Sequence, residues 1–308
     1  MVDGTTKKSV WMKDFKRNWM LYALSLPTLI FIIIFHYIPI YGIQLAFKDF
    51  FALQGIWGSP WVGFENFERF FRSYYFWELI RNTLGINIFQ LVVGFPAPII
   101  LALLLNEVMN SKFKKTVQMV TYAPHFISTV VMVGIIGVFL SQETGVLNVL
   151  IKSLGFEAVP FLTSPRWFKP VFVLSGVWQR VGWGSIIYIA TLAAIDQQLI
   201  EAAIVDGASK LQRIWYINIP GLMPTAIILL ILRVGNIMGV GFEKVFLLQN
   251  PLNQSSSDVI STFVYRIGLV GADYSFATAV GLFNSVINCI LLITVNAISR
   301  KVSETSLW

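Results

Sequence analysis

Charged residues are scarce in this chain. Asp, Glu, Lys and Arg make up 13% of its 308 residues, whereas hydrophobic residues make up 56%. Soluble domains carry roughly 25% charged residues, and a globule of this length needs that charge to cover its surface. The low charge excludes a soluble two-domain enzyme, which the length alone would allow. It indicates an integral membrane protein.

Cysteine and histidine are almost absent. The single cysteine, Cys289, cannot form an internal disulfide and is expected to be a small buried hydrophobe. With only His36 and His125 beside it, the chain has too few ligands for a protein-built zinc or haem site. The sequence also lacks a Gly-Lys dipeptide and therefore a phosphate-binding P-loop. We expect no metal and no cofactor in this chain, so any ATP must be bound by another chain.

Long stretches without charge locate the membrane spans. Four stretches, 18–47, 82–106, 116–142 and 274–299, exceed the roughly 20 residues that a helix needs to cross the hydrocarbon core. Two further spans contain one arginine each, Arg180 and Arg233. The sequence thus predicts one all-α transmembrane domain over 1–308. Its six spans are expected at about 20–43, 83–105, 117–140, 170–193, 221–242 and 275–298.

Lysine and arginine crowd the segments that flank the spans on one side. They are Lys7, Lys8, Lys13, Lys16 and Arg17 before the first span, Lys112, Lys114 and Lys115 after the second, and Arg300 and Lys301 after the sixth. Basic residues accumulate in cytoplasmic loops. We therefore expect a multi-pass protein of the cell membrane with both termini in the cytoplasm.

Two of the outer loops contain helix signals. The aromatic residues Phe64, Phe67, Phe71 and Tyr74 recur at helical spacing before the second span. Charged residues lie between them. This pattern predicts an amphipathic helix at the outer membrane interface. In the last outer loop, Ser255 to Asp258 precede an apolar run, and Ser and Asp favour helix starts, so a short helix is expected there.

Carboxylates avoid the middle of every predicted span. Transporters driven by protons or sodium use buried acids to carry the coupling ion, so this absence argues against a self-energised pump. It also removes the acid of a carboxylate-based hydrolytic site. Arg180 and Arg233 lie within spans, where a charge marks either a water-lined face or a pairing with a neighbouring subunit or a backbone carbonyl.

One cytoplasmic loop, at about 196–220, has a specific pattern. Residues 197–206 are good helix formers, Gly207 permits a sharp reversal, and a second helical segment runs to Pro220, where the fifth span opens. A helical hairpin with mixed faces between two spans suits docking into a groove on a cytosolic partner. The alternative, a solvated connecting loop, is disfavoured by the density of Ala and by the central Gly.

This loop resembles the EAA loop of binding-protein-dependent ABC import permeases. The similarity lies in Glu201-Ala202-Ala203, in Asp206-Gly207-Ala208, in Pro220, and in the spacing between them. In that family the loop is a coupling helix that sits in a cleft of the ATPase subunit. The resemblance implies the six-helix bundle of type I importer permeases. It implies ATPase contact for Glu201, Ala202, Ala203, Asp206, Gly207, Ala208, Ser209 and Gln212.

Other segments are similar to carbohydrate permeases. Before the second span these are Trp61 to Phe67, Phe76-Trp77 and Asn82-Thr83. Later segments look like the branch that imports complex oligo- or polysaccharides in Gram-positive bacteria: Phe242 to Pro251, Asp258-Val259-Ile260, Tyr265-Arg266 and the closing Ser306-Leu307-Trp308. Asn250-Pro251 stands where better-known sugar permeases usually have a glycine-proline stretch, which supports the subbranch.

The resemblance implies one permease subunit of an oligosaccharide importer that performs no chemistry itself. The implied partners are a second homologous permease, two ATPase subunits that hold ATP and Mg, an extracellular solute-binding lipoprotein and the lipid bilayer, but no nucleic acid. The permease would alternate between inward- and outward-facing packings, biased by ATP binding on its partners. A permease for peptides or amino acids is the nearer alternative, and a membrane-embedded enzyme the more distant one.

A sugar pathway needs aromatic faces and amide or guanidinium donors in a concave site. The spans of the second half offer Trp178, Arg180, Trp183, Tyr188, Arg233, Asn236, Phe283, Asn284 and Asn288. Residues of these types are more often packing residues, so we expect only some of them to touch substrate. The two arginines suggest a substrate with carboxylates, such as uronic acids.

Overall fold

The computed structural model describes residues 5–303 and 306–307, and this part of the chain is folded mainly into helices. The other residues of the predicted domain, Trp308 of the closing motif among them, lie outside the described part. Within it, four helices are long and apolar enough to cross a membrane, or six if two bent pairs each count as one span. The predicted all-α membrane fold is confirmed.

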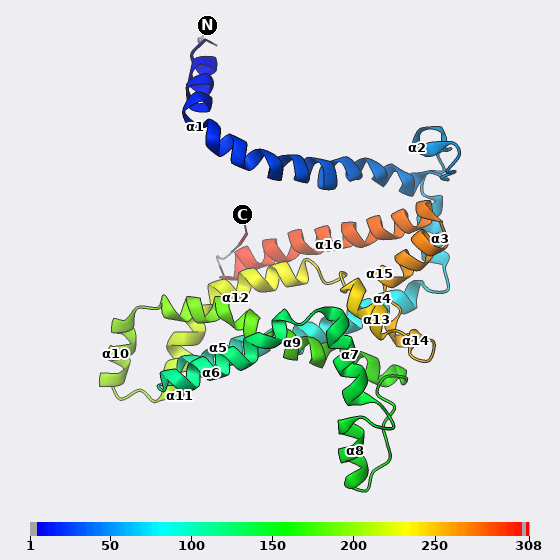
Figure 1. Cartoon of the computed structure of the whole chain (residues 1–308). Coiled ribbons are helices and arrows are strands. Elements are labelled where there is room, and N and C mark those ends of the chain that lie inside the picture. Colours follow the sequence, from blue (N-terminus) through cyan, green and yellow to red (C-terminus); the bar gives the residue numbers. More distant parts are fainter. Residues whose placement is uncertain (1–4, 304–305, 308) are drawn as a thin grey trace.

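The first candidate span lies apart from the rest of the molecule over most of its length (Figure 1). It starts within α1 (Thr5–Ile32) and continues through a π turn (Ile33–Tyr37) and a 3-10 segment (Ile38–Phe47). Most of its large apolar side chains are exposed, which leaves them to lipid or to another chain.

After the first span, α2 (Gly55–Gly58) and α3 (Glu65–Arg72) lie at the end of the molecule opposite α10 (Gln197–Val205) (Figure 1). The predicted amphipathic helix is α3, but it is shorter than the aromatic stripe. It begins at Glu65, and extended backbone at Ser73 ends it, so Phe64 and Tyr74 lie outside the helix. Its buried aromatic residue is Phe70, which packs against the rings of Phe76, Phe276 and Phe283.

The second candidate span, Phe76–Asn106, is built from α4 (Phe76–Phe89), a π turn (Gln90–Gly94) and α5 (Pro96–Asn106). Next come α6 (Ser111–Tyr122), a 3-10 turn (Ala123–Phe126) and α7 (Thr129–Leu140), which is bent by 105° from the helix before it. A single helix over 117–140 is therefore wrong. Ser128 starts a new helix, because its side chain accepts a hydrogen bond from the Val131 amide at 3.3 Å.

Beyond α7, α8 (Val146–Ser153) extends the chain into an arm that projects from the body (Figure 1). The chain returns through α9 (Pro165–Ala193), which packs against α5, α6 and α12. A bend of 74° separates α9 from α10 (Gln197–Val205). We call the end of the bundle that carries α10 the hairpin end.

The fifth candidate span, Lys210–Val234, contains α11 (Lys210–Arg213), a π turn (Ile214–Asn218) and α12 (Ile219–Val234). The predicted span 221–242 is wrong at its second boundary, because the helix ends at Val234. Gly235 packs so closely on Leu292 that a Cβ would overlap it, and the Met238 amide donates to Asn288 Oδ1 at 3.0 Å. The unwound segment thus finds hydrogen bonds within the protein, as non-helical backbone at membrane depth requires.

The chain ends with α13 (Phe242–Leu248), α14 (Gln254–Ser257), α15 (Ile260–Val264), a π turn (Tyr265–Val270) and α16 (Tyr274–Ser303). α15 is the short helix predicted after Ser255 to Asp258. Three apolar clusters hold the bundle together. They surround Phe263 near α3, Val173 in the middle, and Leu192 at the hairpin end.

Candidate functional site

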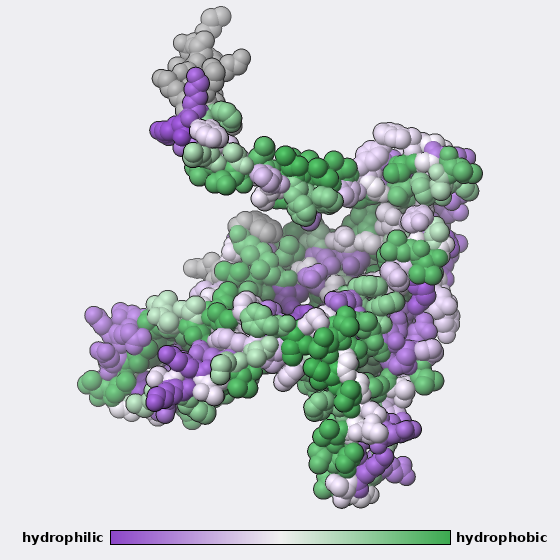
Figure 2. All heavy atoms as spheres, in the orientation of Figure 1, coloured by the Kyte–Doolittle hydropathy of each residue, from purple (hydrophilic) through white to green (hydrophobic). Residues whose placement is uncertain are grey.

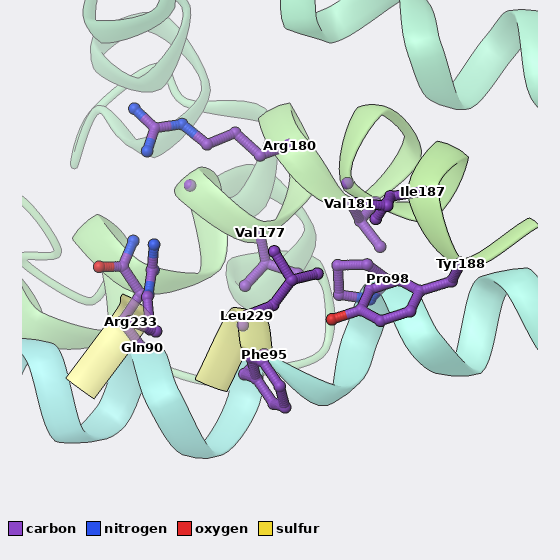
Figure 3. A pocket seen from close by; sticks show the side chains of 13 residues that line it. Gln90, Phe95, Pro98, Val177, Arg180, Val181, Ile187, Tyr188, Leu229 and Arg233 are labelled. Atoms are coloured by element: carbon purple, nitrogen blue, oxygen red, sulfur yellow. The ribbon is translucent and has the colours of Figure 1, made fainter. Parts of the chain in front are cut away.

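Two adjoining cavities lie between α4, α5, α9 and α12. The first has a volume of about 290 Å³, and its lining includes Gln90, Phe95, Pro98, Val177, Arg180, Tyr188, Leu229 and Arg233 (Figure 3). The second, of about 230 Å³, shares Gln90, Gly176, Arg180 and Arg233 with the first and adds Asn87, Phe172, Asn236 and Lys244 among others. The shared residues make the two cavities one polar recess with an apolar extension toward Tyr188.

Local backbone features give this recess its shape. The π turn at Gln90–Gly94 separates α4 from α5 and places Gln90 at the wall that both cavities share. Glycine lets α9 approach its neighbours: a Cβ at Gly184 would lie 3.1 Å from the Pro98 ring, and one at Gly182 would overlap the Thr121 carbonyl oxygen. Larger residues would push α9 away from α5 and α6.

Positive charge dominates the recess. Among the described lining residues of the two cavities, Arg180, Arg233 and Lys244 are cationic, and none is Asp or Glu. Within the described part of the chain, Arg180 and Arg233 form no hydrogen bond or ion pair, and both are exposed. Figure 2 shows hydrophilic residues in the hollow below α1, within a largely hydrophobic surface. This arrangement favours the water-lined face over pairing with a backbone carbonyl.

Lys244 lies on α13, outside the candidate spans, and is buried. Its Nζ donates a 2.9 Å hydrogen bond to the Phe172 carbonyl and lies 4.8 Å from the centroid of the Phe172 ring. Burial, and secondly the charge of Arg180, lower the pKa of Lys244 to about 7. An anion bound in the recess would oppose both effects.

The structure brings four of the nine predicted pathway residues to the cavities: Arg180, Tyr188, Arg233 and Asn236. The other five lie elsewhere. Trp178 and Trp183 are exposed on α9, and the Trp183 ring stacks on His125 with centroids 4.4 Å apart. Phe283 packs in the Phe70 cluster, and Asn288 binds the Met238 amide. Asn284 Oδ1 is buried without a hydrogen-bond partner in the described structure.

Three polar cavity residues escaped the sequence reasoning: Asn87, Gln90 and Lys244. The first two lie in the charge-free stretch 82–106, where polar side chains were a usable signal. Lys244 lies in the segment from Phe242 to Pro251, which attracted attention only as a family resemblance. No group of three or more His, Cys, Asp or Glu that could hold a metal occurs in residues 5–303 and 306–307.

The second feature is the hairpin formed by α10 and α11, which projects at the far end of the bundle (Figure 1). Gly207 makes the reversal with a φ of +78°. Ser209 and Gln212 then start α11 with a capping box: Ser209 Oγ accepts from the Gln212 amide, and Gln212 Oε1 accepts from the Ser209 amide at 2.7 Å. The predicted helix, glycine turn and second helix are all present.

The residues implied for ATPase contact lie on this hairpin. Glu201, Ala202, Asp206, Gly207, Ser209 and Gln212 are exposed, and Ala203 and Ala208 are partly buried. Large apolar side chains are exposed beside them: Leu199, Ile204, Val205, Leu211, Trp215 and Tyr216. An exposed apolar patch of this kind marks an interaction surface. The contact with an ATPase stays a prediction.

The second arm of the hairpin is continuous with the fifth span, so the expected boundary at Pro220 is wrong. Proline removes an amide donor, and its ring clashes with the carbonyl four residues earlier in an α-helix. The π turn at Ile214–Asn218 ends two residues before Pro220 and changes the hydrogen-bond register of the turn that precedes the proline. The helix therefore passes through Pro220 without ending.

A match to the family described as binding-protein-dependent transport system inner membrane component covers residues 94–304. Since the match spans more than half of the chain, the protein is a membrane transport subunit that belongs to this family. The predicted resemblance is confirmed.

Individual relatives agree with this assignment. Protein LplB of Bacillus subtilis (strain 168) is 45% identical over 97% of this chain and 94% of its own length. The polygalacturonan/rhamnogalacturonan transport system permease protein YteP of the same strain is 41% identical over 94% of this chain and 90% of its own. A chain of a solved bacterial alginate ABC transporter, in complex with an alginate pentasaccharide-bound periplasmic protein, has a TM-score of 0.88 and 43% identity. That match covers 96% of this chain and 99% of the other.

Proposed function

We propose that this chain is the permease of an ABC importer that conducts acidic oligosaccharides. The observation that carries the proposal is the convergence of Arg180, Arg233 and Lys244 on a recess whose described lining contains no carboxylate. Unpaired cations are costly in a membrane unless water or an anion compensates them. A chain of uronate units supplies carboxylates at regular intervals and suits such a recess.

The other lining residues fit a sugar. Asn87, Gln90 and Asn236 offer amide groups that donate to and accept from hydroxyls, and Tyr188 offers a ring. The cationic recess would repel the positively charged amino terminus of a peptide, and its described lining contains no carboxylate to balance that charge.

Two relatives support the acidic substrate class. YteP is named for polygalacturonan and rhamnogalacturonan transport. The solved relative belongs to a transporter for alginate, which is described as an acidic polysaccharide. At 41% and 43% identity, these two proteins are similar to this chain over nearly its whole length.

The proposed assembly follows from the surfaces that this chain leaves uncovered. Two ATPase subunits, which hold ATP and Mg, would dock on the exposed apolar side chains of the hairpin, and a second homologous permease would complete the pore. An extracellular binding lipoprotein would deliver substrate at the α3 end. The bilayer would cover the remaining apolar surface, with both termini in the cytoplasm. No nucleic acid and no cofactor of this chain take part.

The test is uptake into vesicles that contain the whole importer, with acidic and neutral oligosaccharides of equal length supplied on the loaded binding protein. We expect uptake of the acidic oligosaccharide and a loss of about tenfold or more in Arg180→Gln and in Arg233→Gln, since each removes a charge-assisted contact of about 1.5–3 kcal/mol. Arg300→Gln, at an exposed site outside the recess, is the control. Unchanged acidic uptake in both recess variants would remove the proposed substrate class.

A further inference from the structure

Glu107 joins the hairpin to the membrane bundle. It is the residue directly after α5, and its side chain is 19% exposed. Glu107 Oε2 accepts a hydrogen bond from Arg213 Nη2 at 3.2 Å, and Oε1 accepts one from Asn218 Nδ2 at 3.4 Å. Asn218 is buried. Both oxygens of one carboxylate are thus engaged by the helix that continues the hairpin into the fifth span.

The spacing of the two donors is unusual for an α-helix. Arg213 and Asn218 are five positions apart, which at 3.6 residues per turn places their side chains about 140° apart around the axis. The π turn at Ile214–Asn218 begins directly after Arg213 and ends at Asn218. Its hydrogen bonds close from each residue to the fifth one along, so residues five apart come nearly one above the other. The π turn therefore allows both donors to reach Glu107.

The two helices that meet at Glu107 also lead to the recess. α5 continues backward into the π turn that begins with Gln90, and α12 carries Arg233. Between Glu107 and the recess, Leu103 of α5 and Leu222 of α12 pack in the same apolar cluster as Tyr188. A displacement of the hairpin that is held at Glu107 would move both walls of the recess together.

We propose that Glu107 is a positioning residue that ties the second arm of the hairpin to α5, so that the ATPase cycle reaches the substrate recess through both α5 and α12. This inference rests on the proposed function, because it takes the hairpin as the ATPase contact. Arg213 and Asn218 are the two anchoring points on the hairpin side. The π turn that follows Arg213 and ends at Asn218 keeps both side chains within reach of Glu107.

The experiment uses the complete importer reconstituted in vesicles and measures ATP hydrolysis with and without loaded binding protein. Three forms are compared with the wild type: Glu107→Gln, Glu107→Ala, and the exchange Glu107→Arg with Arg213→Glu. Glu143→Gln is the matched control, since Glu143 is an exposed carboxylate between α7 and α8, away from the hairpin.

We expect Glu107→Ala to keep its ATPase subunits and its basal hydrolysis. Its stimulation by loaded binding protein should fall by about fivefold or more, the lower end of typical coupling between two sites. Glu107→Gln has one acceptor oxygen in place of two and should show a smaller loss. The exchange should restore stimulation, because the ion pair is rebuilt and Asn218 can turn its carbonyl oxygen toward the new arginine. Glu143→Gln should behave as the wild type.

Full stimulation in Glu107→Ala would overturn the inference. The inference would also be overturned if Glu107→Ala lowered the amount of protein or of bound subunits but left the ratio of stimulated to basal hydrolysis unchanged. In that case Glu107 would only stabilise the bundle. If Glu107→Ala does not assemble, Glu107→Gln and the exchange decide by the same ratio. If the wild-type importer prefers neutral oligosaccharides, only the proposed substrate class is overturned. The test of Glu107 still holds, because the variants are compared with the wild type on whichever oligosaccharide stimulates its ATP hydrolysis.

Discussion

Replacing Gly207 by Val tests whether the hairpin couples transport to ATP hydrolysis. Gly207 has a φ of +78°, and nothing lies within 4 Å of a Cβ built there. A substitution therefore meets no neighbour and acts through the backbone alone. A left-handed conformation costs a residue with a Cβ about 1–2 kcal/mol, and a β-branched side chain lies at the upper end. That cost lowers the population of the native turn by about 5- to 30-fold relative to its alternatives.

The alternatives to the native turn tilt α10 away from α11, while the membrane helices keep their own packing. We expect Gly207→Val to reach normal levels in the membrane, and either to lose ATPase subunits during purification or to retain them without stimulation by substrate. Gly207→Asn should keep most of the activity, because Asn tolerates a positive φ. The measurements are subunit stoichiometry and substrate-stimulated hydrolysis of ATP in reconstituted vesicles.

Gly155 provides a matched control for this prediction. It has a φ of +84°, also with nothing within 4 Å of a Cβ, and it follows α8 at a distance from the hairpin. Gly155→Val introduces the same strain and should leave stimulation unchanged. Normal stoichiometry and full stimulation in Gly207→Val would refute the coupling role and show the hairpin to be a connector.

Two further predictions concern the recess. The lowered pKa of Lys244, about 7, means that its charge is lost as the pH rises through that value. Because a bound carboxylate raises this pKa, the ratio of acidic-oligosaccharide uptake by the wild type to uptake by Lys244→Arg should be highest below about pH 7 and fall above it. A ratio that does not change with pH would contradict this linkage. A Cβ at Gly182 would overlap the Thr121 carbonyl oxygen. Gly182→Val should therefore separate α9 from α6 and lower the thermal unfolding temperature of the purified complex. Gly134→Val is the control and should leave that temperature unchanged, because nothing lies within 4 Å of a Cβ at Gly134.

Much of the site was beyond the reach of sequence reasoning because it depends on which helices meet. Gln90 and Arg233 share a cavity wall although they belong to the second and fifth candidate spans. Trp178 and Trp183 have the residue type expected of a sugar site, yet both are exposed and neither lines the recess. Residue type gave the list of candidates, but only helix packing selected Arg180, Tyr188, Arg233 and Asn236 from it.

Helix ends show the same division. The sequence correctly predicted the hairpin, since a run of helix formers and a glycine act through neighbours in the chain, as does the Ser209–Gln212 capping box that the structure adds. It missed the end of α12 at Val234, because the unwound segment after it is stabilised by Asn288 of α16. It also missed the passage of the helix through Pro220, which a π turn accommodates.

Taken alone, the sequence determined the membrane class, the approximate positions of the spans and the reversal at Gly207. These features depend on the composition of short segments and on the backbone freedom of single residues, which act locally. The tertiary structure decided which charges face a common recess and which residue, Glu107, holds the hairpin to α5. Those features depend on contacts between helices distant in the chain, because a side chain's partner there is set by packing and not by its neighbours in sequence.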